Sequence, residues 1–328
     1  MSVSLLICDD SSFARKQMAQ CLPDNWDVDI SFASNGVEGL EAIKAGKGEL
    51  VFLDLNMPEL DGYSVLKEIR KQDLNSMVIV VSGDVQPEAR NKVRDLGALD
   101  FIKKPVDNEK LITILKQYGI ETENKKSTQP VNVKVDFFDC CQELVNVAIG
   151  QAANLLARLL NVFVILPVPK VNLLAATEMH MALELTDKED NVSAVCQGFM
   201  ASGIAGEALL FFNDSSFTDI ARLMNYKGDI DDKIEIELLM DIASILIGAC
   251  LKGMAEQLNI NFSQGHPIVL GQHRKIKDII NTSPRWKNTL AIEVNYKIDN
   301  HNINCDLLLL FTEDSIKELN NKIAGILN

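Results

Sequence analysis

The first 119 residues alternate short apolar runs with amphipathic stretches. The stretches between the runs repeat apolar positions every three or four residues, as helices do. Five strands alternating with five helices predict a parallel, doubly wound sheet that is covered on both faces. We therefore expect an α/β domain over residues 1–120, whose strands are the runs SLLIC, VDISFA, LVFLDL, MVIVVS and ALDFIKK.

The pattern breaks at residues 121–134. This segment, ETENKKSTQPVNVK, has no apolar periodicity until its end and is rich in polar and charged residues, which is typical of a linker. As a flexible coil its ends would lie about 20 Å apart, so several arrangements of the flanking domains are open.

Residues 135–328 predict a second domain built on a different plan. A long helix with an apolar face, the strand-like runs VFVILPV, EMHMALEL, SAVCQGFMA and EALLFF, and the helix SFTDIARLMNY form a first set. A long helix from residue 232, the runs PIVLG, TLAIEVNYKI and NINCDLLLLF, and a last helix from residue 313 form a second set in similar order. Because helix, strands and helix appear twice, we expect an α+β domain with mainly antiparallel pairing and an internal pseudo-repeat.

Composition narrows the classes of partner. The net charge is −14 and the pI is about 4.8, which disfavours attraction to nucleic acid or to an anionic membrane surface. The sequence contains no apolar run of the roughly 18 residues that span a bilayer. Seven scattered cysteines favour a reducing compartment over a disulfide framework, so we expect a cytoplasmic protein.

Polar and charged side chains stand where the strands of the first domain end. Asp9 and Asp10 follow the first strand, Asp54 the third, Ser82 the fourth and Lys104 the fifth. The carboxyl ends of parallel strands meet at one edge of a sheet, where ligands usually bind. Three carboxylates together favour a hard cation such as Mg²⁺, while a lysine and a hydroxyl would hold a phosphoryl group. Asp54 is the candidate nucleophile.

This half resembles the receiver domain of two-component response regulators over its whole length, through the acidic pair, the run DLNMPELDG, Ser82 and KKP. The resemblance implies that Asp54 accepts phosphate from a cognate histidine kinase with Mg²⁺ bound by Asp9, Asp10 and Asp54. It further implies that Ser82 and Phe101 act as switch residues and that Lys104 binds the phosphoryl group. Phenylalanine cannot form the hydrogen bond that a tyrosine could in its switched position.

The second domain carries the pattern D-x3-E-x2-N-x22-P. Asp139, Glu143, Asn146 and Pro169 form it, and the first three would lie on one face of a helix. The pattern resembles the signature of the CheC/CheX/FliY family of phosphatases, which hydrolyse the phospho-aspartate of response regulators. The resemblance implies that Asn146 orients the attacking water and that Glu143 pairs with the lysine of the substrate receiver. Asp139 is expected to support the helix start, and Pro169 to shape a turn.

A second copy of the pattern stands in the same frame in the second set of elements. Glu237, Asp241, Ser244 and Pro267 keep the spacing, but aspartate replaces glutamate and serine replaces asparagine. We therefore expect one intact site and one degenerate site, the latter at Asp241 and Ser244.

Three functions stay open from the sequence. The first is a phosphatase controlled by its receiver and acting on a separate CheY-type receiver. The second is an enzyme that empties Asp54 of its own chain, and the third is a binding module that docks on a chemotaxis, CheD-like or flagellar-switch partner. Output to DNA is disfavoured because residues 121–328 carry more acidic than basic residues. A receiver emptied at once by its own tether could hardly store a signal, so we expect the phosphatase helix not to reach Asp54 of its own chain. Homodimer formation is left open.

Overall fold

A computed structural model of the chain describes residues 2–23, 26–120, 122, 135–175, 191–275, 288–298, 301 and 303–326. Contacts divide the chain into two compact units, Met1–Glu143 and Leu144–Asn328. The proposed linker falls almost wholly outside the described residues, and so does the predicted strand EMHMALEL.

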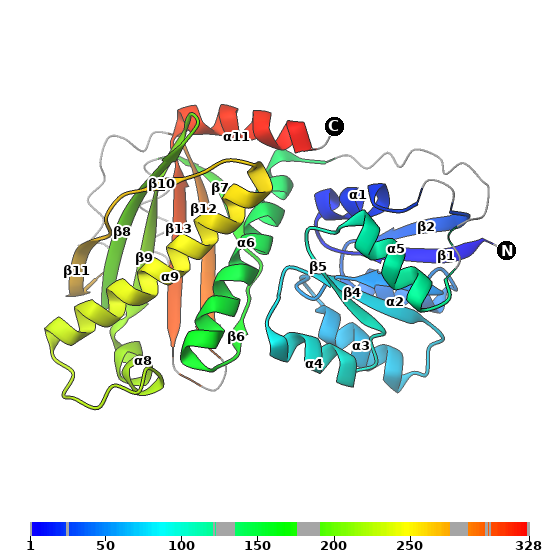
Figure 1. Cartoon of the computed structure of the whole chain (residues 1–328), viewed down its shortest axis with the longest axis horizontal. Coiled ribbons are helices and arrows are strands. Elements are labelled where there is room, and N and C mark those ends of the chain that lie inside the picture. Colours follow the sequence, from blue (N-terminus) through cyan, green and yellow to red (C-terminus); the bar gives the residue numbers. More distant parts are fainter. Residues whose placement is uncertain are drawn as a thin grey trace. The chain divides into compact units, whose positions relative to one another are not determined.

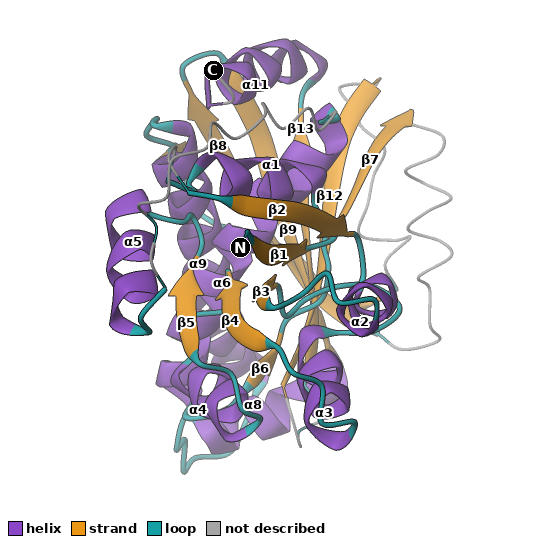
Figure 2. Cartoon of the chain, turned by 90° about the vertical axis from the view of Figure 1, so that its right-hand side faces the viewer, coloured by secondary structure: helices purple, strands orange, loops and turns teal. Residues whose placement is uncertain are grey.

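The first unit contains the predicted five-stranded parallel sheet (Figures 1 and 2). Its strand order is β2-β1-β3-β4-β5, and every neighbouring pair is parallel. The strands are β1 (Val3–Cys8), β2 (Val28–Ala33), β3 (Leu50–Leu53), β4 (Met77–Ser82) and β5 (Asp100–Lys103). The helices are α1 (Ser12–Gln20), α2 (Gly36–Lys44), α3 (Gly62–Lys71), α4 (Pro87–Asp95) and α5 (Asn108–Gln117).

Successive residues of each strand point to opposite faces of this sheet, so each strand contributes to two cores. Leu5 and Ile7 of β1 pack with α1 and α5, whereas Leu6 and Cys8 pack with α2, α3 and α4. Because both faces are covered, the strands read as continuous apolar runs in the sequence.

The segment between β3 and α3 brings the backbone close to the end of β3. Asp61 caps α3, since its side chain accepts a hydrogen bond from Ser64 N at 2.7 Å. Gly62 follows it, and a Cβ at this position would lie 2.2 Å from the carbonyl oxygen of Asp54. The Asp-Gly pair therefore fixes the loop that closes over Asp54.

The second unit consists of antiparallel strands and four described helices. The helices are α6 (Phe137–Leu160, which begins in the first unit), α8 (Phe217–Leu223), α9 (Asp232–Leu258) and α11 (Glu313–Ile326), with the short 3₁₀ helix η1 (Asp214–Ser216) before α8. The strands are β6 (Val164–Ile165), β7 (Lys170–Ala175), β8 (Val192–Ala201), β9 (Ile204–Asn213), β10 (Ser263–Gln264), β11 (Ile268–Arg274), β12 (Asn288–Ile298) and β13 (Asn304–Phe311).

The two sets of elements exchange strands within one sheet. The long strands run in the order β8-β9-β13-β12, with β9 and β13 paired at the centre. The short strands of the first set, β6 and β7, pair with β12 of the second, while β10 and β11 of the second set pair with β8 of the first. The predicted α+β class, antiparallel pairing and pseudo-repeat are thus confirmed.

The helices α6 and α9 pack closely against each other. A Cβ on Gly253 of α9 would lie 2.8 Å from Ala148 Cα of α6, so only glycine allows this approach. Nearby, Gln257 Nε2 donates to the carbonyl oxygen of Leu144 at 2.8 Å. Helix α9 also contacts β8 and β9, as Figure 1 displays. None of the described helices is both long and apolar enough to cross a lipid bilayer.

One histidine connects three elements of the second unit, at what we call the His273 cluster. His273 Nδ1 lies 2.9 Å from Asp214 Oδ2 of η1, and Nε2 lies 3.1 Å from Glu235 Oε2 of α9. The hydrogen bond to Asp214 raises the pKa of His273, although partial burial opposes it. Burial raises the pKa of Glu235, against the effect of His273.

Candidate functional site

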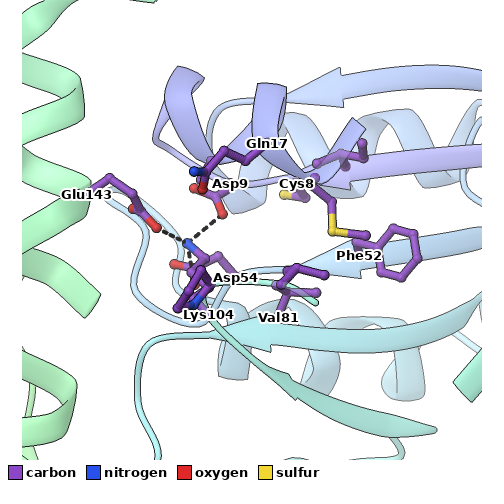
Figure 3. A pocket seen from close by; sticks show the side chains of 13 residues that line it. Cys8, Asp9, Gln17, Phe52, Asp54, Val81, Lys104 and Glu143 are labelled. Carbon is purple, nitrogen blue, oxygen red and sulfur yellow. Dashed lines mark ion pairs between the residues drawn. The ribbon is translucent and has the colours of Figure 1, made fainter. Parts of the chain in front are cut away.

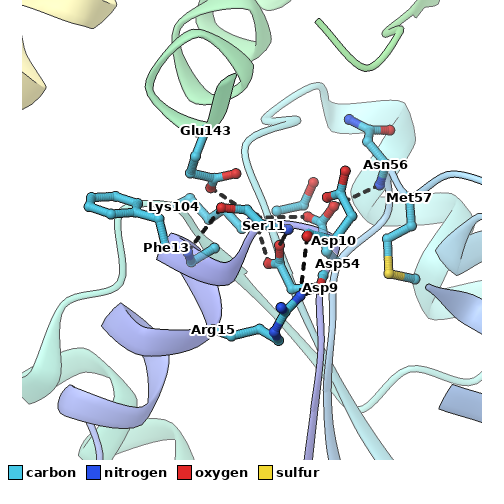
Figure 4. A network of polar contacts seen from close by, with 12 residues as sticks. Asp9, Asp10, Ser11, Phe13, Arg15, Asp54, Asn56, Met57, Lys104 and Glu143 are labelled. Atoms are coloured by element: carbon cyan, nitrogen blue, oxygen red, sulfur yellow. Dashed lines mark hydrogen bonds and ion pairs between the residues drawn. The ribbon is translucent and has the colours of Figure 1, made fainter. Parts of the chain in front are cut away.

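The acidic residues predicted to converge meet at the carboxyl edge of the parallel sheet. One oxygen from each of Asp9, Asp10 and Asp54 lies within 4.8 Å of the others. Asp54 N donates to the carbonyl oxygen of Cys8 at 2.9 Å, which continues the pairing of β1 and β3 up to the site. Asp54 Oδ2 accepts from Asn56 N at 2.9 Å, as Figure 4 displays. The backbone at the strand ends therefore fixes the positions of the three carboxylates.

Lys104 follows β5 and extends into this cluster (Figure 3). Its Nζ lies 2.7 Å from Asp9 Oδ2, 3.3 Å from Asp54 Oδ1 and 2.9 Å from Glu143 Oε1. Burial alone would lower the pKa of Lys104, but the negative charges around it raise this pKa well above its ordinary value. The ammonium group thus stays charged although its side chain is only 5% exposed.

Negative charge exceeds positive charge at this edge. Burial, followed by the charge of Asp54, raises the pKa of Asp10 to about 7. Burial also raises the pKa of Asp9 well above its ordinary value, with Lys104 opposing the shift. A divalent cation would lower the repulsion among the four carboxylates here, which face a single ammonium group. The four belong to Asp9, Asp10, Asp54 and Glu143. Oxygen ligands at these separations suit Mg²⁺, so the residues fit the predicted ion.

A small cavity lies against the same groups. Its volume is about 20 Å³, roughly the space that one or two water molecules need. Asp9, Gln17, Asp54, Lys104 and Glu143 are among the residues that line it (Figure 3). The cavity therefore has room for a water beside the carboxylate of Asp54.

The two predicted switch residues lie on neighbouring strands. Ser82 ends β4 and is fully buried. Its Oγ accepts from Asp84 N at 3.2 Å, so the hydroxyl hydrogen can still be donated to a phosphoryl oxygen. Phe101 of β5 is partly buried, and the guanidinium carbon of Arg90 lies 5.1 Å from the centroid of its ring. Their roles as switches stay predictions.

The start of α6 differs from what the sequence predicted for Asp139. Asp136, not Asp139, caps this helix, since its Oδ2 accepts from Phe138 N at 3.2 Å. The Asp139 carboxylate instead accepts from Ser12 N at 3.2 Å, from Phe13 N at 2.8 Å and from the Ser12 hydroxyl. Asp139 does lie in the first turn of α6, where a carboxylate suits the helix dipole, but its hydrogen bonds go to the start of α1. An acid directly before the run FFDCC was the missed signal for the true cap.

Glu143 lies one turn beyond Asp139 on the same helix, and it contacts the lysine that the motif predicts. Its partner is Lys104 of its own chain, and the Glu143 side chain is 4% exposed. Burial raises the pKa of Glu143, while the charge of Lys104 lowers it. This pair lies within the first unit, which ends at Glu143.

The two copies of the motif differ in burial. Asn146 is 3% exposed, and its Oδ1 has no hydrogen-bond partner among the described residues. At the second copy Asp241 and Ser244 are exposed, and the Ser244 hydroxyl donates to the carbonyl oxygen of Met240 on its own helix at 2.8 Å. The intact copy therefore holds an amide oxygen ready for a partner, whereas the hydroxyl of the second copy is already occupied.

The motif prolines occupy corresponding places. Pro169 is buried and immediately precedes β7, while Pro267 immediately precedes β11. Each lies outside a strand, where its missing N–H leaves no ladder bond unmade. Pro169 lies between β6 and β7, and its role in shaping a turn there stays a prediction.

Comparison with known proteins covers the two parts unequally. The model of the response regulator receiver domain matches residues 5–116. The chemotaxis protein CheY of Treponema pallidum is 36% identical over 33% of this chain and 76% of its own length. CheY of Bacillus subtilis is 33% identical over 34% of this chain and 93% of its own length.

Solved structures extend the comparison. The crystal structure of Thermotoga maritima FliY is similar with a TM-score of 0.45 and 16% identity, over 60% of this chain and all of that one. The CheX–CheY–BeF₃–Mg²⁺ complex of Borrelia burgdorferi contains a chain that is similar with a TM-score of 0.33 and 28% identity, over 36% of this chain and 90% of that one.

Proposed function

Since the chain belongs to the family of response regulator receiver domains through residues 5–116, we propose that it accepts a phosphoryl group on Asp54 and removes it again by hydrolysis. A histidine kinase supplies the phosphoryl group, and the output belongs to chemotaxis or flagellar signalling in the cytoplasm. The receiver spans residues 1–120, the linker 121–134, and the CheC-like phosphatase domain 135–328.

Phosphorylation uses the cluster at the sheet edge. An oxygen of Asp54 attacks the donor phosphorus, and the bond from phosphorus to the donor breaks. Lys104 neutralises the phosphoryl charge, and Ser82 donates its hydroxyl hydrogen to it. Mg²⁺ held by Asp9, Asp10 and Asp54 would supply the remaining positive charge.

Hydrolysis needs a water placed in line with the bond from phosphorus to Asp54. Asn146 accepts a hydrogen bond from this water through Oδ1, the buried oxygen that has no partner among the described residues. Water attacks phosphorus, the bond to the Asp54 oxygen breaks, and Asp54 leaves as a carboxylate together with inorganic phosphate and a proton. Catalysis of this kind is mainly positioning and electrostatics.

One observation carries the proposal. Glu143 of the motif pairs with Lys104 at 2.9 Å, and the same ammonium lies 3.3 Å from the phospho-acceptor Asp54. We therefore take phospho-Asp54 of the same chain as the first substrate. A separate CheY-type receiver that presents a lysine in the same place offers Glu143 the same contact and is tested beside it.

The test follows the phosphate on Asp54. The full-length protein is labelled with a small phosphodonor and Mg²⁺, the donor is removed, and decay of the label is measured. Asn146→Ala should lengthen the lifetime by a factor of about ten to a thousand, while the matched Ser244→Ala variant should not change it. Asp54→Ala should take up no label.

Addition of a labelled CheY-type receiver to unlabelled protein measures action on a second molecule. Equal lifetimes for the wild type, Asn146→Ala and Ser244→Ala would refute the phosphatase. That result would favour the alternative of a binding module that docks on a flagellar-switch or CheD-like partner.

A further inference from the structure

The N-terminus of helix α1 is completed by a residue far away in the sequence. The first N–H groups of a helix have no acceptor within it. Ser11 Oγ accepts from Ala14 N at 3.1 Å, which satisfies the third of them. The first and second, Ser12 N and Phe13 N, donate to the Asp139 carboxylate.

The acceptor is suited to this place by its charge. A carboxylate at a helix N-terminus is stabilised by the partial positive charge there. The Ser12 hydroxyl adds a third, charge-assisted hydrogen bond to the same carboxylate. Asp136 already caps α6, so the Asp139 carboxylate can accept hydrogen bonds from another segment.

Two acids at the start of α6, both within the first unit, thus bind different parts of that unit. Asp139 and Glu143 are four residues apart, so they lie on one face of the helix. Glu143 pairs with Lys104, which is a feature of the phosphorylation site. Asp139 binds the start of α1, where the side chain of Ser12 takes part.

We propose that Asp139 is the docking residue by which α6 selects the receiver of its own chain, through the hydroxyl and the two free N–H groups at the start of α1. It is a positioning residue, which sets Glu143 against Lys104 and does not act on phosphate. An acidic residue in place of Ser12 would repel the Asp139 carboxylate, although an acid at that position would stabilise the N-terminus of α1. This inference rests on the proposed phosphatase function only for its kinetic consequence.

Hydrogen exchange of single amides in the full-length, unphosphorylated protein tests the contact itself. In Asp139→Ala the Phe13 amide should exchange about ten- to a hundredfold faster, because its acceptor is lost. The Ala14 amide, whose acceptor Ser11 is unchanged, serves as the internal control. Ser12→Asp should likewise speed exchange at Phe13 while leaving Ala14 unchanged.

An unchanged Phe13 amide in Asp139→Ala overturns the proposal, and so does an equal acceleration at Ala14, because the whole first turn would then have loosened. Asn146→Ala should leave both amides unchanged, since it alters only the chemistry.

The lifetime of phospho-Asp54 provides the second readout. Asp139→Ala and Ser12→Asp should each lengthen this lifetime about ten- to a hundredfold. The lifetime is measured at two protein concentrations that differ about a hundredfold. A lifetime that shortens with concentration means that docking occurs between chains, and this overturns selection of the chain's own receiver. If Asn146→Ala has no effect on the lifetime, the phosphatase function fails, yet exchange at Phe13 still decides the docking.

Discussion

Substitution of Glu143 by glutamine separates the role of its charge from that of its shape. A hydrogen bond that involves a charged group contributes about 1.5–3 kcal/mol. Breaking a buried ion pair usually costs about 3–5 kcal/mol because one charge is left alone. Lys104 would still have Asp9 at 2.7 Å and Asp54 at 3.3 Å. We therefore expect the free energy of unfolding to fall by less than about 2 kcal/mol.

The effect on hydrolysis should be larger than the effect on stability. Without the Glu143 charge, Lys104 is held less firmly toward α6, and the loss of about 1.5–3 kcal/mol corresponds to a rate lower by about ten- to 150-fold. Denaturant unfolding gives the first quantity, and decay of labelled phospho-Asp54 with Mg²⁺ gives the second. Asp241→Asn, at the corresponding exposed position of the second copy, is the matched control. Unchanged decay in Glu143→Gln, or a stability loss above about 3 kcal/mol, would refute the reasoning.

Three further predictions concern stability. Burial raises the pKa of Asp10 to about 7. The contribution of this carboxyl group to folding stability is therefore full below the unfolded pKa of about 4 and is lost as pH rises through 7. Asp10→Asn should raise the melting temperature at pH 8 without Mg²⁺ and should abolish stabilisation by Mg²⁺. Gly253→Ala should destabilise by about 1–3 kcal/mol in denaturant titrations because its Cβ meets the α6 backbone, whereas Gly248→Ala on the same helix should stabilise by about 0.5–1 kcal/mol. Because the pKa of His273 is raised in the folded protein, its contribution to folding stability is full below the unfolded pKa of about 6.5 and is lost as pH rises through the raised pKa. His273→Gln should therefore weaken the dependence of the melting temperature on pH between pH 6 and 8, and His266→Gln should not.

The sequence predicted most reliably what depends on neighbouring residues. The alternation of apolar runs and amphipathic stretches was enough for the parallel sheet, because strands buried on both faces leave an unmistakable local pattern. The meeting of Asp9, Asp54 and Lys104 followed from the rule that parallel strands end at one edge. The repeated order of elements in residues 135–328 likewise predicted the pseudo-repeat.

Contacts between distant residues could not be predicted in this way. Asp139 binds Ser12 and Phe13 across 127 and 126 residues, and no periodicity relates an acid on one helix to the free N–H groups of another. The pairing of β7 with β12 was equally hidden, since a strand pattern specifies the faces of a strand but not its neighbour. Local sequence patterns predict which face of an element a side chain occupies, whereas tertiary packing determines which distant residue it contacts.

The exchange of short strands between the two sets has a consequence for any shortened chain. A polypeptide that stops after α8 would retain β6 and β7 but lack β12, the strand with which both pair. It would also leave the edge of β8 without β10 and β11, and open strand edges invite association. Such a half could complete its sheet only by borrowing from a second molecule. The domain therefore resembles an intertwined dimer whose two subunits have been joined by a peptide bond.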